Sequence, residues 1–134
     1  MDSVPWDDRF SVGVPELDAE HRRLVDTLNR LHEATVSGRG PGTLEPLLAI
    51  LVQQAGTHFM SEERYLRETQ FAEYDEHKAK HAELMGQVYE LKRRLETDHT
   101  TFTPETVQFL KDWVLRHILI ADLKYAVKPA RAMA

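Results

Sequence analysis

The chain has 134 residues, none of them cysteine; 42% are apolar, and the formal net charge is −5. This length suits one domain with a full core. The lack of cysteine excludes disulfides, cysteine-ligated iron–sulfur clusters, thiolate zinc sites and haem attached through cysteine. An acidic chain without a basic stripe is not expected to bind nucleic acid. We find no secretory signal and no apolar run long enough to cross a bilayer, so we expect a cytoplasmic protein without membrane contact, unless it is a domain cut from a longer chain.

The first residues have no helical period, and prolines and a glycine interrupt them, so we predict an extended arm. Four segments follow in which apolar residues recur every three to four positions, as on the buried face of a helix. Gly38 should end the first helix, Thr43 should cap the second, and Thr103 should cap the fourth. The predicted segments are an arm at residues 1–14, helices at residues 15–37, 43–66, 74–97 and 103–128, and a tail at residues 129–134.

Four helices joined by short connections predict an all-α fold, an up-down-up-down four-helix bundle with an extended N-terminal arm. We expect a single domain across residues 1–134, in which residues 15–128 form the helical bundle. Near the start of the third helix, His77 and His81 are four residues apart and therefore lie on one helix face. The apolar stripe that follows continues that face, so both imidazoles should point into the bundle.

Every predicted helix carries polar residues at positions that its apolar stripe turns inward. They are His21 on the first helix, His58 and Glu62 on the second, His77 and His81 on the third, and His117 and Asp122 on the fourth. The two remaining histidines, His32 and His99, are predicted to be exposed and without a role. Five separately hydrogen-bonded histidines, or a polar network that sets the packing of the helices, would explain part of this pattern. A metal site explains all of it with one cause, because helix bundles build such sites from facing side chains.

The number of ligands favours two metal ions over one. A single tetrahedral zinc ion would leave three of the seven side chains unused. If both carboxylates and one hydroxide or oxide bridge two octahedral ions, eleven of the twelve coordination positions are filled. The open position is a place for a small molecule. Imidazole and carboxylate ligands suit non-haem iron well and do not exclude manganese or zinc.

The fourth helix poses a geometric problem. His117 and Asp122 are five residues apart, which on an ideal α-helix turns them about 140° away from each other. Both must nevertheless reach the same metal pair. We therefore predict a widened turn, a π-bulge or a helix break between them, a distortion that is often found at functional sites.

The order and spacing of these residues resemble the signature of the hemerythrin family, and most closely that of its bacterial members. The matching motifs are His21, His58-x3-Glu62, His77-x3-His81 and His117-x4-Asp122. The matching flanking residues are Trp6, Val12-Gly13-Val14, Leu17-Asp18, Phe59, Trp113 and Ile118. The resemblance covers residues 6–126. One position departs from it: animal members often carry leucine after the tryptophan of the fourth helix, where this chain has Val114.

The resemblance implies two iron ions bridged by an oxo or hydroxo group and by two carboxylates. One iron would be held by His77, His81 and His117, the other by His21 and His58, and the bridges would be Glu62 and Asp122. The family binds O2 reversibly at the less-coordinated iron, so the implied function is oxygen transport, storage or delivery rather than catalysis. Small anions such as azide would bind at the same position. Two other functions stay open: an O2 or redox sensing module, and a di-iron enzyme that acts on peroxide or nitric oxide.

Overall fold

The computed structural model describes residues 10–98 and 103–120, and it gives the backbone alone for Pro41 and residues 117–120. The helices are α1 (Pro15–Val36), α2 (Pro41–Glu68), α3 (Tyr74–Thr97), α4 (Pro104–Asp112) and the π-helix η3 (Trp113–Ile120), which continues α4. The part of the chain described contains no strand, and none of its helices has the length and apolar character that crossing a membrane needs.

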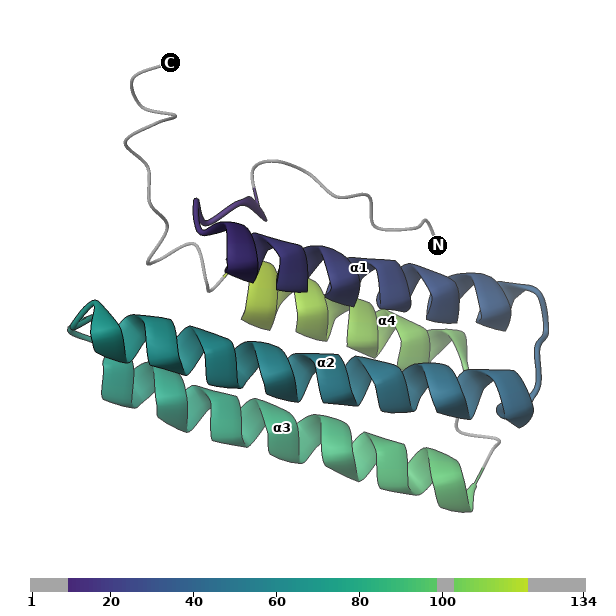
Figure 1. Cartoon of the computed structure of the whole chain (residues 1–134). Helices are drawn as coiled ribbons and strands as arrows, with labels where there is room; N and C mark the ends of the chain where they lie inside the picture. Colours follow the sequence, from purple (N-terminus) through teal and green to yellow (C-terminus); the bar gives the residue numbers. More distant parts are fainter. Residues whose placement is uncertain (1–9, 99–102, 121–134) are drawn as a thin grey trace.

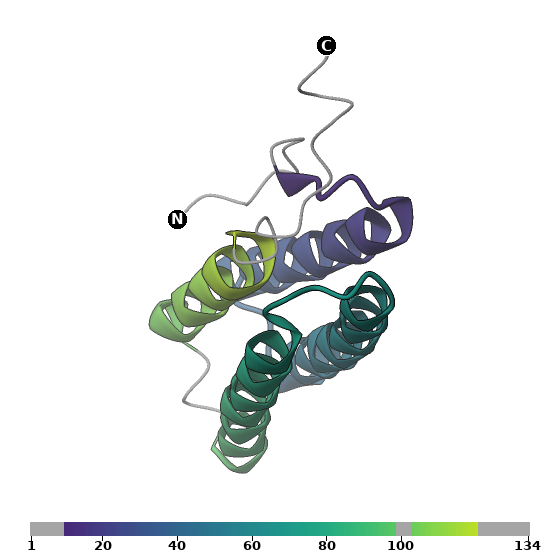
Figure 2. The same cartoon turned by 90° about the vertical axis from the view of Figure 1, so that its left-hand side faces the viewer.

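Successive helices run in opposite directions along one common axis (Figure 1). Seen along that axis, the four helices surround a shared interior (Figure 2). Among the described residues, α1 packs on both α2 and α4, and α3 packs mainly on α2. The predicted all-α, up-down-up-down four-helix bundle is therefore confirmed.

The helix boundaries follow from the residues that flank them. α1 starts with Pro15, whose missing N–H is not needed in the first turn, and it ends just before Gly38, which takes a positive φ of 72°. The Thr103 hydroxyl accepts a hydrogen bond at 3.3 Å from a backbone N–H in the first turn of α4, as expected of an N-cap. The second helix differs from the prediction, because it begins at Pro41 rather than around Thr43. Proline suits the first helical position there as it does in α1.

Two apolar clusters hold the bundle together. The larger one joins all four helices, and its fully buried members include Leu24, Leu28, Leu48, Leu84 and Leu110. The smaller one consists of Val12, Leu17 and Leu66. Apolar burial of this kind stabilises a fold by about 25 cal/mol for each Å² removed from water.

The inward polar residues lie between these two clusters. Along α1, His21 lies between Leu17 of the smaller cluster and Leu24 of the larger one. On α2, Glu62 is placed between the clusters in the same way, and it is completely buried. The apolar side chains on both sides therefore keep water away from the polar layer.

The burial of His32 corrects the sequence analysis. This side chain was expected on the surface, but the residue is buried, with 9% of its area exposed. It follows Leu28 by four positions and lies next to Leu31, so the buried face of α1 is wider than a single stripe. His99, the other histidine without a predicted role, lies outside the described residues.

Candidate metal centre

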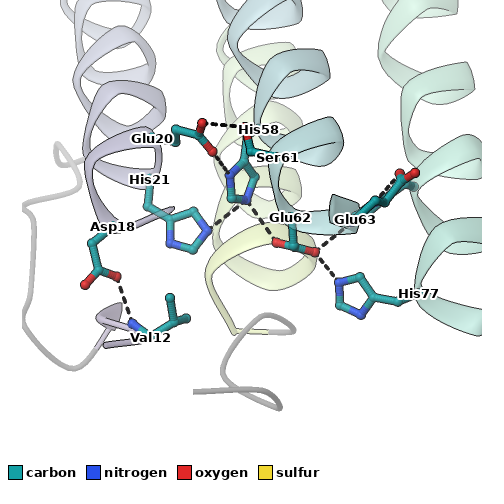
Figure 3. Close-up of polar contacts among 10 residues, drawn as sticks. Val12, Asp18, Glu20, His21, His58, Ser61, Glu62, Glu63 and His77 are labelled. Carbon is teal, nitrogen blue, oxygen red and sulfur yellow. Dashed lines mark hydrogen bonds and ion pairs between the residues drawn. The ribbon is translucent and has the colours of Figure 1, made fainter. Parts of the chain in front are cut away.

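His21 of α1 and His58 of α2 point toward each other in the bundle interior, and neither residue is exposed to solvent (Figure 3). Their Nε2 atoms are 2.9 Å apart, and their ring centroids are 4.4 Å apart. Two neutral imidazoles can make this contact only if one ring donates its N–H to the lone pair of the other. A cation between them would instead take both lone pairs. The pair therefore offers two nitrogen ligands to one point.

The carboxylate of Glu62 lies between two groups of histidines and has no exposed surface. Its Oε2 atom is 3.1 Å from Nε2 of His58. Its Oε1 atom contacts Nε2 of His77 and is 2.9 Å from Nε2 of His81. A buried carboxylate is unfavourable without polar partners, and here each oxygen has imidazole partners of its own. One side chain thus presents a separate oxygen to each of two histidine groups.

The second histidine group consists of His77 and His81, both near the start of α3. Their rings are nearly perpendicular, with centroids 4.8 Å apart. The side chain of His81 is 5% exposed and that of His77 is 12% exposed. Both Nε2 atoms contact the same oxygen of Glu62. The four-residue spacing explains this, because it places the two side chains on one face of the helix.

These donors fit metal ions in number, type and spacing. The candidate groups are His21, His58 and Glu62, and Glu62, His77 and His81; within each group the ligand atoms lie within 4.8 Å of one another. Neighbouring ligand atoms around an octahedral ion with bonds of about 2.1 Å are about 3 Å apart. The contacts of 2.9 and 3.1 Å in the first group match that spacing. Nitrogen and carboxylate donors without sulfur are suited to iron, manganese or zinc.

Two glutamates that the sequence analysis did not single out support the histidines from behind. Glu20 Oε1 accepts a hydrogen bond from Nδ1 of His58 at 2.8 Å. Glu63 Oε2 accepts one from Nδ1 of His81, also at 2.8 Å. A histidine that binds metal commonly donates its second ring N–H to a carboxylate, which orients the ring. Each glutamate is next in sequence to a predicted ligand, but this adjacency alone does not show which helix its side chain faces.

Aromatic side chains form an apolar wall beside the second histidine group. The ring of Phe59 stacks on His81, with centroids 4.0 Å apart and planes 11° from parallel. The centroid of Phe59 is 6.2 Å from that of Trp113. Trp113 and Val114 are both buried in the larger apolar cluster. Phe59, which follows His58 in sequence, therefore lies against His81 in space and close to Trp113.

The fourth helix widens at Trp113, where α4 passes into the π-helix η3. The predicted distortion is therefore present, and it begins before His117 rather than after it. A π-helix holds more residues in each turn, which changes the direction of the side chains that follow. The side chain of His117 and the whole of Asp122 lie outside the described residues. The structure thus brings together five of the seven predicted ligands, and the places of the other two stay predictions.

Asp18 connects the described end of the predicted arm to α1. Its Oδ2 atom accepts a hydrogen bond from the Ser11 hydroxyl at 2.6 Å, and its Oδ1 atom accepts one from the backbone N–H of Val12 at 2.8 Å. Gly13 has a positive φ of 77°, a conformation that glycine adopts without strain, and the chain turns there into the helix. Val12 is completely buried beside Leu17, so the end of the arm covers the same end of the bundle as the histidines (Figure 3).

Known proteins resemble this chain over nearly its whole length. The sequence model of the family described as Hemerythrin HHE cation binding domain matches residues 12–127. The bacteriohemerythrin of Methylococcus capsulatus is 28% identical over 116 residues, covering 87% of this chain and 88% of the relative. The myohemerythrin of Riftia pachyptila is 32% identical over 120 residues, covering 90% and 88%. A crystal structure of wild-type hemerythrin matches with a TM-score of 0.80 and 26% identity, covering 93% of this chain and 96% of that one. This chain belongs to the hemerythrin family, which is known for binding O2 at a di-iron site.

Proposed function

We propose that this protein binds O2 reversibly at two iron ions, for oxygen transport, storage or delivery. The observation that carries the proposal is the placement of Glu62, whose two buried oxygens face separate histidine groups. Membership of the hemerythrin family supports iron as the metal. The histidine-rich donor set also differs from the carboxylate-rich sites of ferritin-like oxidases, which favours binding over oxidase chemistry.

We assign the ligands as the resemblance to the family implies. His77, His81 and His117 would hold one iron, His21 and His58 would hold the other, and Glu62 and Asp122 would bridge them together with an oxo or hydroxo group. The first iron would be six-coordinate, and the second would keep one open position. The chemistry that bound irons would supply is a pair of electrons, which O2 takes up on binding and gives back on release.

The residues of the chain would protect this reversible reaction from water. His21 and His58 have no exposed surface, so their ligand atoms face the protein interior. Phe59, Trp113 and Val114 add buried apolar surface around the histidines. Charged products of O2 reduction would cross these apolar surroundings only slowly on their way to solvent, because placing a charge in an apolar environment is costly. Slow loss of those products favours release of O2 over irreversible oxidation.

Metal analysis tests the identity and number of the ions. The protein purified after expression in iron-containing medium should contain about two irons per chain, as the ligand number requires. The reduced, iron-loaded protein mixed with O2 should then form an oxygenated state that persists and releases O2 under argon. One zinc per chain, with no iron incorporated during anaerobic reconstitution, would overturn the proposal. Rapid consumption of O2, peroxide or nitric oxide with product formation would favour an enzyme.

Azide tests which iron has the open position. One azide should bind per pair of ferric ions, on the iron held by His21 and His58. The change that azide causes in the absorption spectrum should saturate at one azide per pair of ferric ions. A crystal structure with azide on the iron of His77, His81 and His117 would contradict the assignment of the two irons.

Asp18 supports sensing as a second candidate function. It holds Ser11 and Val12 through its two oxygens and lies three residues before His21 on the same helix. A displacement of His21 on ligand binding would therefore reach the arm within one helical turn. Hydrogen exchange at the Val12 amide distinguishes the two functions. In a sensor the exchange rate should differ between the oxygen-free and oxygenated protein, whereas in a carrier it should stay the same.

A further inference from the structure

We propose that Glu20 is a positioning residue for His58, and that Ser61 holds Glu20 in place for that role. The inference rests on the proposed function, because it concerns the iron that His21 and His58 would share. Glu20 is not itself proposed as a ligand. The observation behind it is a chain of contacts from Ser61 through Glu20 to His58 (Figure 3).

Glu20 is held at both of its carboxylate oxygens. Oε1 accepts a hydrogen bond from Nδ1 of His58 at 2.8 Å, and Oε2 accepts one from the Ser61 hydroxyl at 2.8 Å. Glu20 lies on α1 and both partners lie on α2, so the contacts join two helices. The side chain of Glu20 is 10% exposed, and that of His58 is not exposed. A buried carboxylate held at two points has few other rotamers, and it holds the His58 ring in one orientation.

This contact decides which nitrogen of His58 faces the candidate iron. A neutral imidazole carries one N–H, and a carboxylate beside Nδ1 keeps the proton on that nitrogen. Nε2 then retains its lone pair. Nε2 is also the atom that lies 2.9 Å from His21 and 3.1 Å from Glu62. The contact of His58 Nδ1 with Glu20, at 2.8 Å, is shorter than that of Nε2 with Glu62, at 3.1 Å, so Glu20 favours the tautomer of His58 that can bind metal.

The corresponding contact from Glu63 to His81 is less constrained. The side chain of Glu63 is 23% exposed, against 10% for Glu20. Among the described residues, no second hydrogen-bond partner holds Glu63, whereas Ser61 holds Glu20. Of these two glutamates, the one behind His58 is therefore more buried and held at both of its oxygens.

A cavity beside Glu20 makes chemical rescue a test of this role. The cavity has a volume of about 160 Å³ and is lined by Glu20, Arg23, Gln53, Gln54 and Thr57. Truncation of Glu20 to alanine would extend this cavity toward Nδ1 of His58. Added formate can then occupy the space and accept the same hydrogen bond. Formate would not repair a fold that had been damaged in some other way.

The experiment compares the iron-loaded wild type with three variants and one matched control. Glu20→Ala should weaken the binding of one iron about 10–100-fold, the usual range for a group that orients a metal ligand, and should shift the absorption of the ferric azide complex. Formate should reverse both changes. Glu20→Gln keeps an acceptor oxygen, so its iron affinity should fall less. Ser61→Ala leaves the contact from Glu20 to His58 in place, so its iron affinity should fall only about fivefold, below the range for the orienting group itself. The control is Glu16→Ala, one turn earlier on α1, where the carboxylate is 62% exposed and pairs with Arg64; it should behave as wild type.

The outcomes separate this inference from the proposed function. If Glu20→Ala has the iron affinity and spectrum of the wild type, the role of Glu20 is overturned and the proposed function is not affected. The same holds if Glu16→Ala loses as much iron affinity as Glu20→Ala. A wild-type protein that binds no iron would overturn the proposed function. The metal-free chain then still decides about Glu20, because side-chain nitrogen NMR at mildly alkaline pH should show His58 protonated at Nδ1, with a shift toward Nε2 in Glu20→Ala. If Glu20→Ala does not fold, wild-type behaviour of both Glu20→Gln and Ser61→Ala would overturn the role.

Discussion

The two histidine groups of the candidate centre are held in different ways. His21 and His58 are completely buried between α1 and α2, whereas the side chain of His77 on α3 is 12% exposed. Behind the first group, Glu20 is fixed by contacts that join two helices. Behind the second group, Glu63 is 23% exposed. One half of the site is therefore more buried and held by contacts between two helices, and the other half lies closer to solvent.

This difference shows that the environment of a ligand depends on how its helix packs. Among the described residues, α1 and α2 pack on each other more extensively than any other two helices. α3 packs mainly on α2, and its first turns leave His77 partly accessible. The two histidine groups therefore offer similar ligand atoms but differ in how far their side chains are buried. We expect solutes to reach the centre from the α3 side.

Removal of the shared carboxylate should have the largest effect, because it affects both halves at once. Glu62→Ala removes one oxygen ligand from each of the two irons, so the variant should retain neither iron. Metal analysis after desalting measures this loss. Glu68→Ala, which removes an exposed glutamate from the same helix, should retain about two irons. Retention of both irons by Glu62→Ala would show that the two halves do not depend on a common carboxylate.

Removal of the aromatic wall should destabilise the fold and open the second half further. Phe59 is 3% exposed and stacks on His81, so Phe59→Ala should lower the free energy of unfolding by about 3–5 kcal/mol. Urea denaturation of the metal-free protein measures the change. Phe59→Leu fills more of the space that the phenyl ring leaves, so its free energy of unfolding should fall less than that of Phe59→Ala. Equal losses in the two variants would argue against a packing role for the ring.

Chemical modification should resolve the difference between the halves without any mutation. In the folded, metal-free protein, diethyl pyrocarbonate should modify His77 and leave His21 and His58 intact, because only His77 has appreciable exposed surface among the three. Iron loading should then protect His77. Mass spectrometry of the resulting peptides identifies each modified residue. Modification of His58 before His77 would reverse the proposed order of accessibility.

A change in the surface pair of Glu90 and Arg93 on α3 should have the smallest effect, and it is the reference for the changes at the candidate centre. A hydrogen bond from Arg93, 2.7 Å away, lowers the pKa of Glu90, and the same contact raises the pKa of Arg93. A carboxyl with a lowered pKa stabilises the fold above its unfolded pKa, and this contribution is lost as the pH falls through the folded pKa. Both side chains are exposed to solvent, so Glu90→Gln should change neither the iron content nor the Tm at neutral pH. A drop in Tm like that of Phe59→Ala would show that the pair is more than a surface contact.

The helices and the bundle could be predicted from the local pattern of the sequence, and so could the chemical type of the candidate ligands. Apolar residues repeat with the period of an α-helix, and this repeat marks the inner face of each helix without reference to the others. His77 and His81 show how far local spacing reaches, because residues four apart on one face meet the same oxygen of Glu62. The five-residue separation of His117 and Asp122 was also sufficient to predict a distorted helix, since an ideal α-helix turns such residues apart.

The contacts between groups on different helices could not be predicted from the sequence. The tertiary structure assigned one oxygen of Glu62 to each histidine group, placed Glu20 behind His58, and buried His32. It also set the start of the π-helix at Trp113, before the predicted distortion. The physical reason is that a helical period gives the direction of a side chain relative to its own axis. The partner of that side chain depends on the rotation and separation of neighbouring helices, which are set by the packing of the whole core.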